Sequence, residues 1–149
     1  MTLALTHPAV GTDHFLEIDG LLLHLWRMGD LDLPAVVVLH GIMGHAREWD
    51  TLSSLLSTRY HVVAVDQRGH GQSAWSTDYT ASRMADDLIG VVEELGLATP
   101  HVVAHSMGGM AALLAAARRP ELFGHLALID IGPDSLTPAL ALTLSGWIE

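Results

Sequence analysis

Short runs of apolar, largely β-branched residues alternate with helical patterns along most of this 149-residue chain. Runs that are apolar on both faces are typical of the buried strands of a parallel sheet. Strands that alternate with helices predict crossover connections between parallel neighbours. The four predicted buried strands are AVVVLH (35–40), HVVAVD (61–66), HVVAH (101–105) and LALIDI (126–131).

The N-terminal part of the chain adds a hairpin to this pattern. The segments FLEI and LLLHLW lie on either side of Asp19-Gly20, a pair that favours a tight turn between antiparallel strands. Together these segments predict an α/β fold with a mainly parallel sheet of about six strands and crossover helices. A chain of this length is expected to form a single domain over residues 1–149.

Three helices are predicted between the strands. The second is capped by Thr80 and stopped by Gly96. The third runs from about Met107 to Arg119 and ends at Pro120, which cannot continue a helix. The predicted apolar faces comprise Trp49, Leu52, Leu55 and Leu56 in the first helix, and Met84, Leu88, Val91, Val92 and Leu95 in the second.

Charge and cysteine content exclude several classes of function. The chain has 7 basic and 17 acidic residues, a net charge of -10 that repels nucleic acids and anionic membranes. It has no cysteine, so neither disulfides nor thiolate metal sites can form, and we predict no metal and no cofactor. The N-terminus lacks a signal pattern, and no apolar run reaches the roughly 18 residues of a membrane span. We therefore expect a soluble cytoplasmic protein.

Ser106 lies directly between a predicted strand and a predicted helix. The backbone must turn sharply there, so the hydroxyl is expected to stand clear of the sheet, as a nucleophile requires. Gly108 and Gly109 let the helix approach the strand. The Met107 amide lies in the first helical turn, where free donors and the helix dipole favour an oxyanion. The alternative is that Ser106 only caps the helix.

Two further segments follow strands at the same edge of the predicted sheet. The first, HGIMG (40–44), is a glycine-rich turn that exposes backbone amides, and His40 is expected to anchor this loop. It matches neither of the glycine-rich patterns that bind dinucleotides or phosphates. The second, DQRGHGQS (66–73), opens a long connection in which Asp66 and Arg68 are expected to satisfy the backbone or each other.

These segments resemble motifs of the α/β-hydrolase superfamily, in particular of its serine esterase-like members. AHSMG (104–108) is similar to the nucleophile elbow G-x-S-x-G, with alanine in place of the first glycine. The other two segments are similar to the H-G-x turn and to D-x-R-G-x-G-x-S of that superfamily. The resemblance covers residues 35–131. It implies that Ser106 is the nucleophile and that the amides of Ile42 and Met107 form the oxyanion hole.

A serine nucleophile needs a base that takes its proton and an acid that orients the base. In the superfamily the chain order is serine, acid, histidine. Asp130, at the end of the last predicted strand, is a possible acid. The only histidine after the serine is His125, which lies at the opposite end of its strand. Chain order alone does not exclude His40, His45 or His70.

The superfamily core has eight strands, commonly with a cap inserted after the sixth. The resemblance therefore implies the N-terminal part of such a core without its C-terminal strands, and residues 134–149 resemble the start of a cap. The function that follows is a hydrolase that acts on small esters through an acyl-enzyme at Ser106. We expect this chain to be impaired or inactive, because the triad histidine is absent.

Two alternatives stay open. The sixth strand is expected to be an unpaired edge, and charged residues make up only 16% of the chain, against about 25% in a typical soluble domain. The first alternative is therefore that the chain is a non-catalytic module, which associates through this edge with a second copy of itself or with a C-terminal half in trans. Within the hydrolases, C–C hydrolases and perhydrolases share the same motifs, so the substrate class is not decided.

Overall fold

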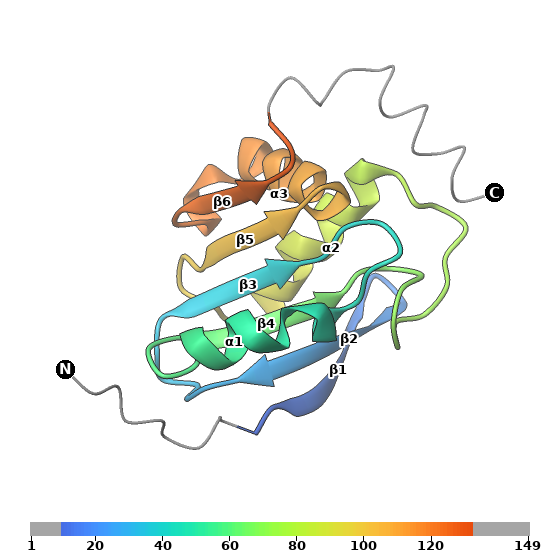
Figure 1. Ribbon diagram of the computed structural model, residues 1–149. Coiled ribbons are helices and arrows are strands. Elements are labelled where there is room, and N and C mark those ends of the chain that lie inside the picture. Colours follow the sequence, from blue (N-terminus) through green and yellow to red (C-terminus); the bar gives the residue numbers. More distant parts are fainter. Residues whose placement is uncertain (1–9, 133–149) are drawn as a thin grey trace.

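Six strands form one sheet in the computed structural model, which describes residues 10–132 (Figure 1). The strand order is β1-β2-β4-β3-β5-β6, and the last four strands in the chain run parallel to one another. The strands are β1 (Thr12–Ile18), β2 (Leu21–Met28), β3 (Ala35–Leu39), β4 (His61–Asp66), β5 (His101–His105) and β6 (Leu126–Ile129). The predicted α/β fold with a mainly parallel sheet of six strands is confirmed.

The predicted hairpin joins this sheet at one edge. Asp19 and Gly20 have φ angles of 48° and 78°, the positive values that a tight two-residue hairpin turn requires. Ile18 pairs with Leu21 across this turn, so β1 and β2 are antiparallel. β2 also pairs with β4 in the antiparallel sense, which makes the hairpin continuous with the parallel strands.

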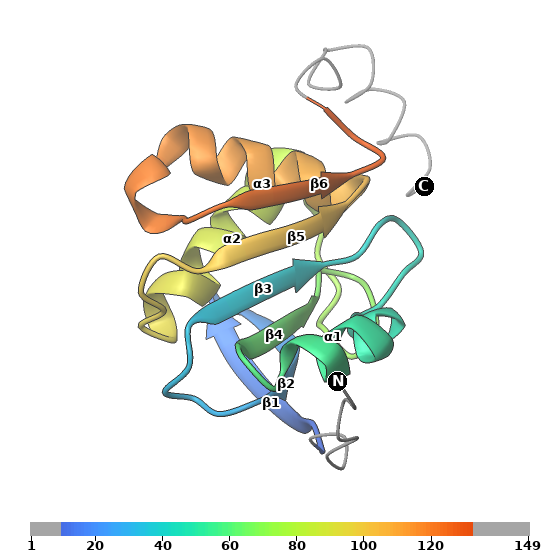
Figure 2. The same ribbon diagram turned by 60° about the vertical axis from the view of Figure 1, so that its left-hand side comes forward.

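Helices cover both faces of the sheet (Figures 1 and 2). The helix α1 (Asp50–Leu56), preceded by a 3-10 turn (Ala46–Trp49), lies on one face. The helices α2 (Ala81–Glu94) and α3 (Met107–Arg118) pack side by side on the other face. A second short 3-10 turn (Pro120–Leu122) follows α3. The larger hydrophobic core lies between the sheet and these two helices and includes Leu23, Val37, Val63, Leu88, Val91, Val102 and Ala111.

The helix α2 begins and ends where the sequence predicts. The side chain of Thr80 accepts a hydrogen bond from the Arg83 amide at 3.3 Å, which caps the first turn. Gly96 has a φ of 61°, the left-handed conformation that ends many helices. The predicted apolar face is buried at Met84, Leu88, Val91 and Val92.

The first helix differs from the prediction. Trp49 belongs to the 3-10 turn, which advances three residues per turn instead of 3.6, so one helical count across both segments selects the wrong face. Leu55 is 71% exposed, whereas Ser53 is fully buried. The prediction that Leu55 shares a buried face with Trp49 and Leu56 is therefore wrong.

The strands at the β6 edge are less covered than predicted. β3 and β4 are buried at every residue, but alternate residues of β5 are only partly buried, and every residue of β6 is partly buried or exposed. The reason is that α1 and the preceding 3-10 turn lie over β2, β3 and β4. β6 also ends at Ile129, because Asp130 has a φ of 55° and turns the chain out of the sheet. The prediction of a strand that is buried on both faces and extends to residue 131 is wrong for β6.

Two further predictions concern the start of a cap and the absence of a membrane span. The segment predicted to start a cap, residues 134–149, lies outside the described residues. Between residues 10 and 132, no helix combines the length and the apolar character that a membrane span requires.

Candidate active site

Ser106 lies at the turn between β5 and α3, at the carboxyl edge of the parallel strands. Its φ of 47° and ψ of -113° lie outside the regions that most residues adopt. Ser106 is the N-cap residue of α3, but its hydroxyl makes no capping hydrogen bond. A serine that only capped the helix would have extended backbone and would accept a bond from the first turn. The geometry matches the predicted sharp turn and argues against the capping alternative.

Main-chain hydrogen bonds hold this turn in place. The amide of Ser106 donates to the carbonyl of Ile129 at 3.0 Å, and the amide of Met110 donates to the carbonyl of Ser106 at 3.2 Å. Met110 is the first donor within α3, so the amide of Met107 precedes it and has no acceptor inside the helix. Among the described residues the Met107 amide therefore has no acceptor, and it lies at the positive end of the helix dipole.

Two glycines allow α3 to begin so close to the sheet. A methyl group added at Gly108 would lie 2.6 Å from the Cβ of Leu39 and 2.7 Å from the carbonyl oxygen of His40. A methyl group at Gly109 would overlap the side chain of Ile131. Any larger residue would push α3 away from the strands, as the sequence predicted for these two positions.

The turn of residues 41–44 lies against Ser106. A methyl group added at Gly41 would lie 3.4 Å from the Cβ of Ser106 and 2.7 Å from the Nδ1 of His105. The Gly44 amide closes the turn on the Gly41 carbonyl at 3.1 Å. Between residues 10 and 132, the Ile42 amide has no protein acceptor. The tertiary structure thus brings the predicted oxyanion donor Ile42 and the predicted nucleophile into the same region.

His40 anchors this turn, as predicted, and is not free to act as a base. Its Nδ1 donates to the Gly41 carbonyl at 2.6 Å, and its Nε2 accepts from the Gln67 amide at 3.0 Å. Burial is the main cause that lowers the pKa of the His40 imidazole, so the ring is neutral at physiological pH. Because both ring nitrogens are engaged, the open alternative that His40 is the base is not supported.

A buried carboxylate holds the loop that follows β4. Asp66 accepts from the Ala46 amide at 2.6 Å and from the Gln72 amide at 2.9 Å, and it lies 2.7 Å from the Nδ1 of His24. Gly71, at a φ of 53°, packs so closely on the carboxylate that no side chain fits there. The sequence predicted that Asp66 would satisfy backbone donors. It gave no signal for the contact with His24, which comes from the hairpin.

Arg68 pairs with Asp87 of α2, not with Asp66. Its Nε and Nη2 each donate to one carboxylate oxygen of Asp87 at 2.7 Å, and both side chains are buried. Its Nη1 donates to the carbonyl of Asp78 at 2.7 Å. The bidentate pair ties the loop between β4 and α2 to the helix, which makes this segment structural. The only feature of the sequence that could have indicated this partner is that Asp87 is an acidic residue at a buried position of α2.

His70, which the sequence left open as a base, is engaged, and His125 lies at the opposite edge of the sheet. The Nδ1 of His70 donates to the carbonyl of Arg68 at 3.0 Å, and its Nε2 accepts from the Met43 amide at 3.3 Å. His125 precedes β6, so it lies one strand length, about 13 Å, from the edge that carries Ser106. His125 is therefore excluded as a partner of Ser106 in this structure, as expected.

The possible acid Asp130 lies near His105, a histidine that was not among the bases predicted from the sequence. The Oδ2 of Asp130 is 3.9 Å from the Nε2 of His105, the residue before Ser106; the Asp130 side chain is exposed and that of His105 is partly exposed. His45 is exposed. Within residues 10–132, no imidazole forms a hydrogen bond with the Ser106 hydroxyl. The described part of the chain thus contains the predicted nucleophile and donors without a base bonded to them.

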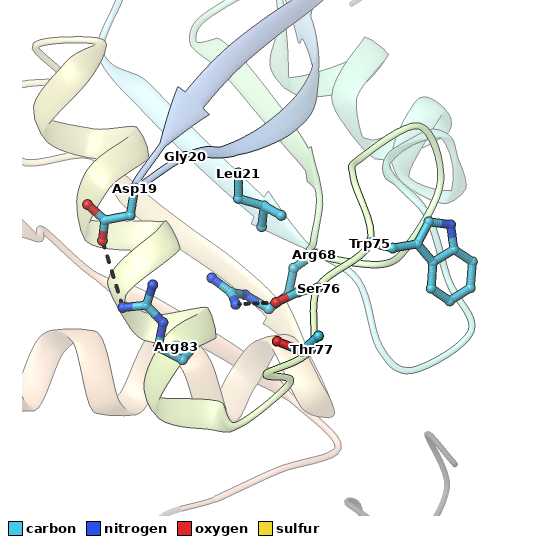
Figure 3. Close-up of a pocket in the computed structure, with 8 residues that line it drawn as sticks. All are labelled: Asp19, Gly20, Leu21, Arg68, Trp75, Ser76, Thr77 and Arg83. Carbon is cyan, nitrogen blue, oxygen red and sulfur yellow. Dashed lines mark hydrogen bonds and ion pairs between the residues drawn. The ribbon is translucent and has the colours of Figure 1, made fainter.

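A hollow of about 430 Å³ lies between the β1–β2 turn, the loop after β4 and the start of α2 (Figure 3). In this hollow Arg83 lies 3.8 Å from Asp19, and Arg68 donates to the hydroxyl of Ser76 at 3.2 Å. Its lining includes no residue of the β5–α3 turn. The two arginines are paired with protein groups, so we do not treat this hollow as the candidate active site. Among residues 10–132, no group of three or more side chains is arranged to hold a metal ion.

Comparisons with known proteins agree with this geometry. A family model described as the alpha/beta hydrolase fold matches residues 34–149. The chain is 40% identical over 112 residues to the sn-1-specific diacylglycerol lipase ABHD11 of Mus musculus, which covers 74% of this chain and 36% of that protein. It is 34% identical over 136 residues to the 2-(acetamidomethylene)succinate hydrolase of Mesorhizobium japonicum, which covers 88% of this chain and 48% of that protein. The chain spans less than half the length of both relatives.

The fold is also that of solved hydrolase structures. The crystal structure of E-2-(acetamidomethylene)succinate hydrolase matches with a TM-score of 0.79 and 32% sequence identity, over 83% of this chain and 46% of that chain. The crystal structure of a membrane phospholipase A matches with a TM-score of 0.78 and 32% identity, over 80% and 39%. The family match, these relatives, the strand order and the strand-to-helix turn lead to one conclusion: this chain belongs to the alpha/beta hydrolase family.

Proposed function

We propose that this chain carries the nucleophile and the oxyanion hole of a serine hydrolase that acts on small esters. One observation carries the proposal: the strained backbone of Ser106 presents a hydroxyl that caps no helix, beside the turn that begins at Gly41. Such strain persists only where the surrounding structure enforces it, and it occurs preferentially at functional sites.

In the proposed reaction, the Oγ of Ser106 attacks the carbonyl carbon of the ester. The carbonyl oxygen becomes negatively charged and accepts hydrogen bonds from the amides of Ile42 and Met107. The intermediate then expels the alcohol and leaves the acyl group on Ser106, and water later releases the acid. A base takes the serine proton and returns it to the alcohol. We propose Asp130 as the acid that orients this base.

The named relatives support substrates of this kind. They include a diacylglycerol lipase, an esterase and a putative carbamate hydrolase. This chain covers only 36% to 43% of the length of these three proteins, so we do not expect their turnover from this chain alone. Since loss of the triad base costs up to about 10⁶ in kcat, we expect at most the small residual ester hydrolysis that the oxyanion donors supply without a base.

Replacing Ser106 by alanine is expected to abolish covalent labelling by an alkyl fluorophosphonate. The probe's phosphorus bonds to the serine Oγ, fluoride leaves and the serine proton passes to solvent, so labelling needs only the attack step; without the base this step is slow. Intact-mass and peptide mass spectrometry after a long incubation measure the extent and the position. Ser54→Ala, which changes a serine of α1, is the control and should label like the parent chain. A parent chain that stays unlabelled, or a Ser106→Ala variant that labels as much as the parent chain, would contradict the proposal.

The open edge of β6 favours a second candidate function, that of a non-catalytic module. Within residues 10–132, β6 pairs with β5 alone, and its Ala127 and Ile129 are exposed. Unpaired strand edges pair readily with other chains, here a second copy or a C-terminal half in trans. Light scattering is expected to show a dimer or a larger species that binds a hydrophobic dye. A compact monomer that binds no dye would count against this candidate.

A further inference from the structure

Met43 combines two unfavourable features in the turn of residues 41–44. It is the third residue of the turn and has a φ of 63°, a conformation that glycine or asparagine usually supplies. Its side chain is also 83% exposed. The left-handed backbone raises the free energy of the folded state, and the exposed side chain gains no burial that could offset this cost. This combination indicates that the side chain has a use at this position.

The position of Met43 is set by its surroundings. Its amide donates to the Nε2 of His70 at 3.3 Å, which holds the backbone of the turn on the loop after β4. The turn begins at Gly41, which lies against Ser106. The Met43 thioether is therefore held in solvent, two residues from the point where the turn contacts the proposed nucleophile.

The other methionines of the described part are buried. Their exposed fractions are between 3% and 7%, and they are Met28, Met84, Met107 and Met110. An oxidant must reach the sulfur atom, so the rate of methionine oxidation follows exposure. An exposed fraction of 83% against at most 7% predicts that Met43 is oxidised about tenfold faster than the others.

We propose that Met43 is an oxidation site, at which a hydroperoxide converts the thioether to a sulfoxide. The sulfur attacks one peroxide oxygen and the O–O bond breaks. Sulfur is oxidised by two electrons and keeps that oxygen, while the peroxide is reduced to water or to an alcohol. Sulfoxide reductases reverse this change. If the proposed function holds, the new S=O group replaces apolar surface with polar surface on the turn that contacts Ser106 through Gly41, which weakens contacts with the alkyl chain of a bound ligand.

The first experiment measures the modification alone. The chain is treated with dilute hydrogen peroxide, and the mass increase of each methionine-containing peptide is followed over time. The Met43 peptide is expected to gain one oxygen about tenfold faster than the peptides with the four buried methionines. Met43→Leu is the control, in which this fast phase should vanish. Equal rates at all five positions, or faster oxidation of a buried methionine, would overturn the proposal.

The second experiment measures the effect on the neighbouring site. Oxidation of the parent chain is expected to slow labelling of Ser106 by a long-chain alkyl fluorophosphonate about fourfold, the equivalent of one buried methylene group. Met43→Leu treated with peroxide should label at its untreated rate. Unchanged labelling of the oxidised parent would overturn the link to the site. If Ser106 does not label even before oxidation, the proposed function fails, whereas selective oxidation of Met43 is still decided by the first experiment.

Discussion

Replacing Asp66 by alanine is expected to lower the free energy of unfolding by about 3–5 kcal/mol. The substitution removes one buried acceptor from three partners at once, the amides of Ala46 and Gln72 and the imidazole of His24. Each buried donor left without an acceptor costs about 1–3 kcal/mol. These three partners come from the hairpin, the first 3-10 turn and the loop after β4, so no single rearrangement can satisfy all of them.

Urea denaturation followed by circular dichroism measures this loss. Asp32→Ala, which removes an exposed carboxylate, is the control and should change the unfolding free energy by less than about 0.5 kcal/mol. Asp66→Asn retains one acceptor oxygen and should give an intermediate loss. If Asp66→Ala unfolds within about 1 kcal/mol of the parent chain, then the loop after β4 does not depend on this carboxylate.

The second large effect is expected from Arg68→Met, with a loss of about 3–5 kcal/mol in the free energy of unfolding. The two hydrogen bonds at 2.7 Å to Asp87 disappear, and a buried carboxylate is left without its counter-charge. Methionine fills a similar volume, so a cavity contributes little to the loss. The double variant Arg68→Met with Asp87→Leu removes both charges and should recover most of the lost stability.

The loss in Arg68→Met is expected to depend on pH. Burial raises the pKa of the Asp87 carboxyl, and the hydrogen bonds from Arg68 oppose that rise. Without Arg68, the pKa of Asp87 in the folded state lies further above its value in the unfolded chain. Protonation then favours the folded state, so the deficit should shrink as the pH falls from about 8 toward about 5. Denaturation at several pH values measures this, and a deficit that grows on acidification would contradict the buried-charge explanation.

Most of the secondary structure was predictable, because the apolar pattern of each segment depends on its own burial. The two fully buried strands β3 and β4 appear in the sequence as uninterrupted apolar runs, and α2 appears with its cap at Thr80. The errors arose where burial depends on coverage by other elements. Leu55 fits an apolar helical face, but no element within residues 10–132 covers it. β6 has the composition of a covered strand, but its Ala127 and Ile129 are exposed.

The local geometry of the site was predictable from neighbouring residues alone. Neighbouring residues restrict the backbone sterically at three places. These are Ser106 between its strand and its helix, the two glycines that follow it, and the glycine-rich turn at Gly41. Contacts between residues far apart in the chain, in contrast, depend on how the helices and strands pack. Asp87 binds Arg68 across 19 positions and His24 contacts Asp66 across 42. The periodicity of a segment indicates on which face of the helix or strand a side chain lies. Which polar group lies opposite that side chain depends on how the helices and strands pack.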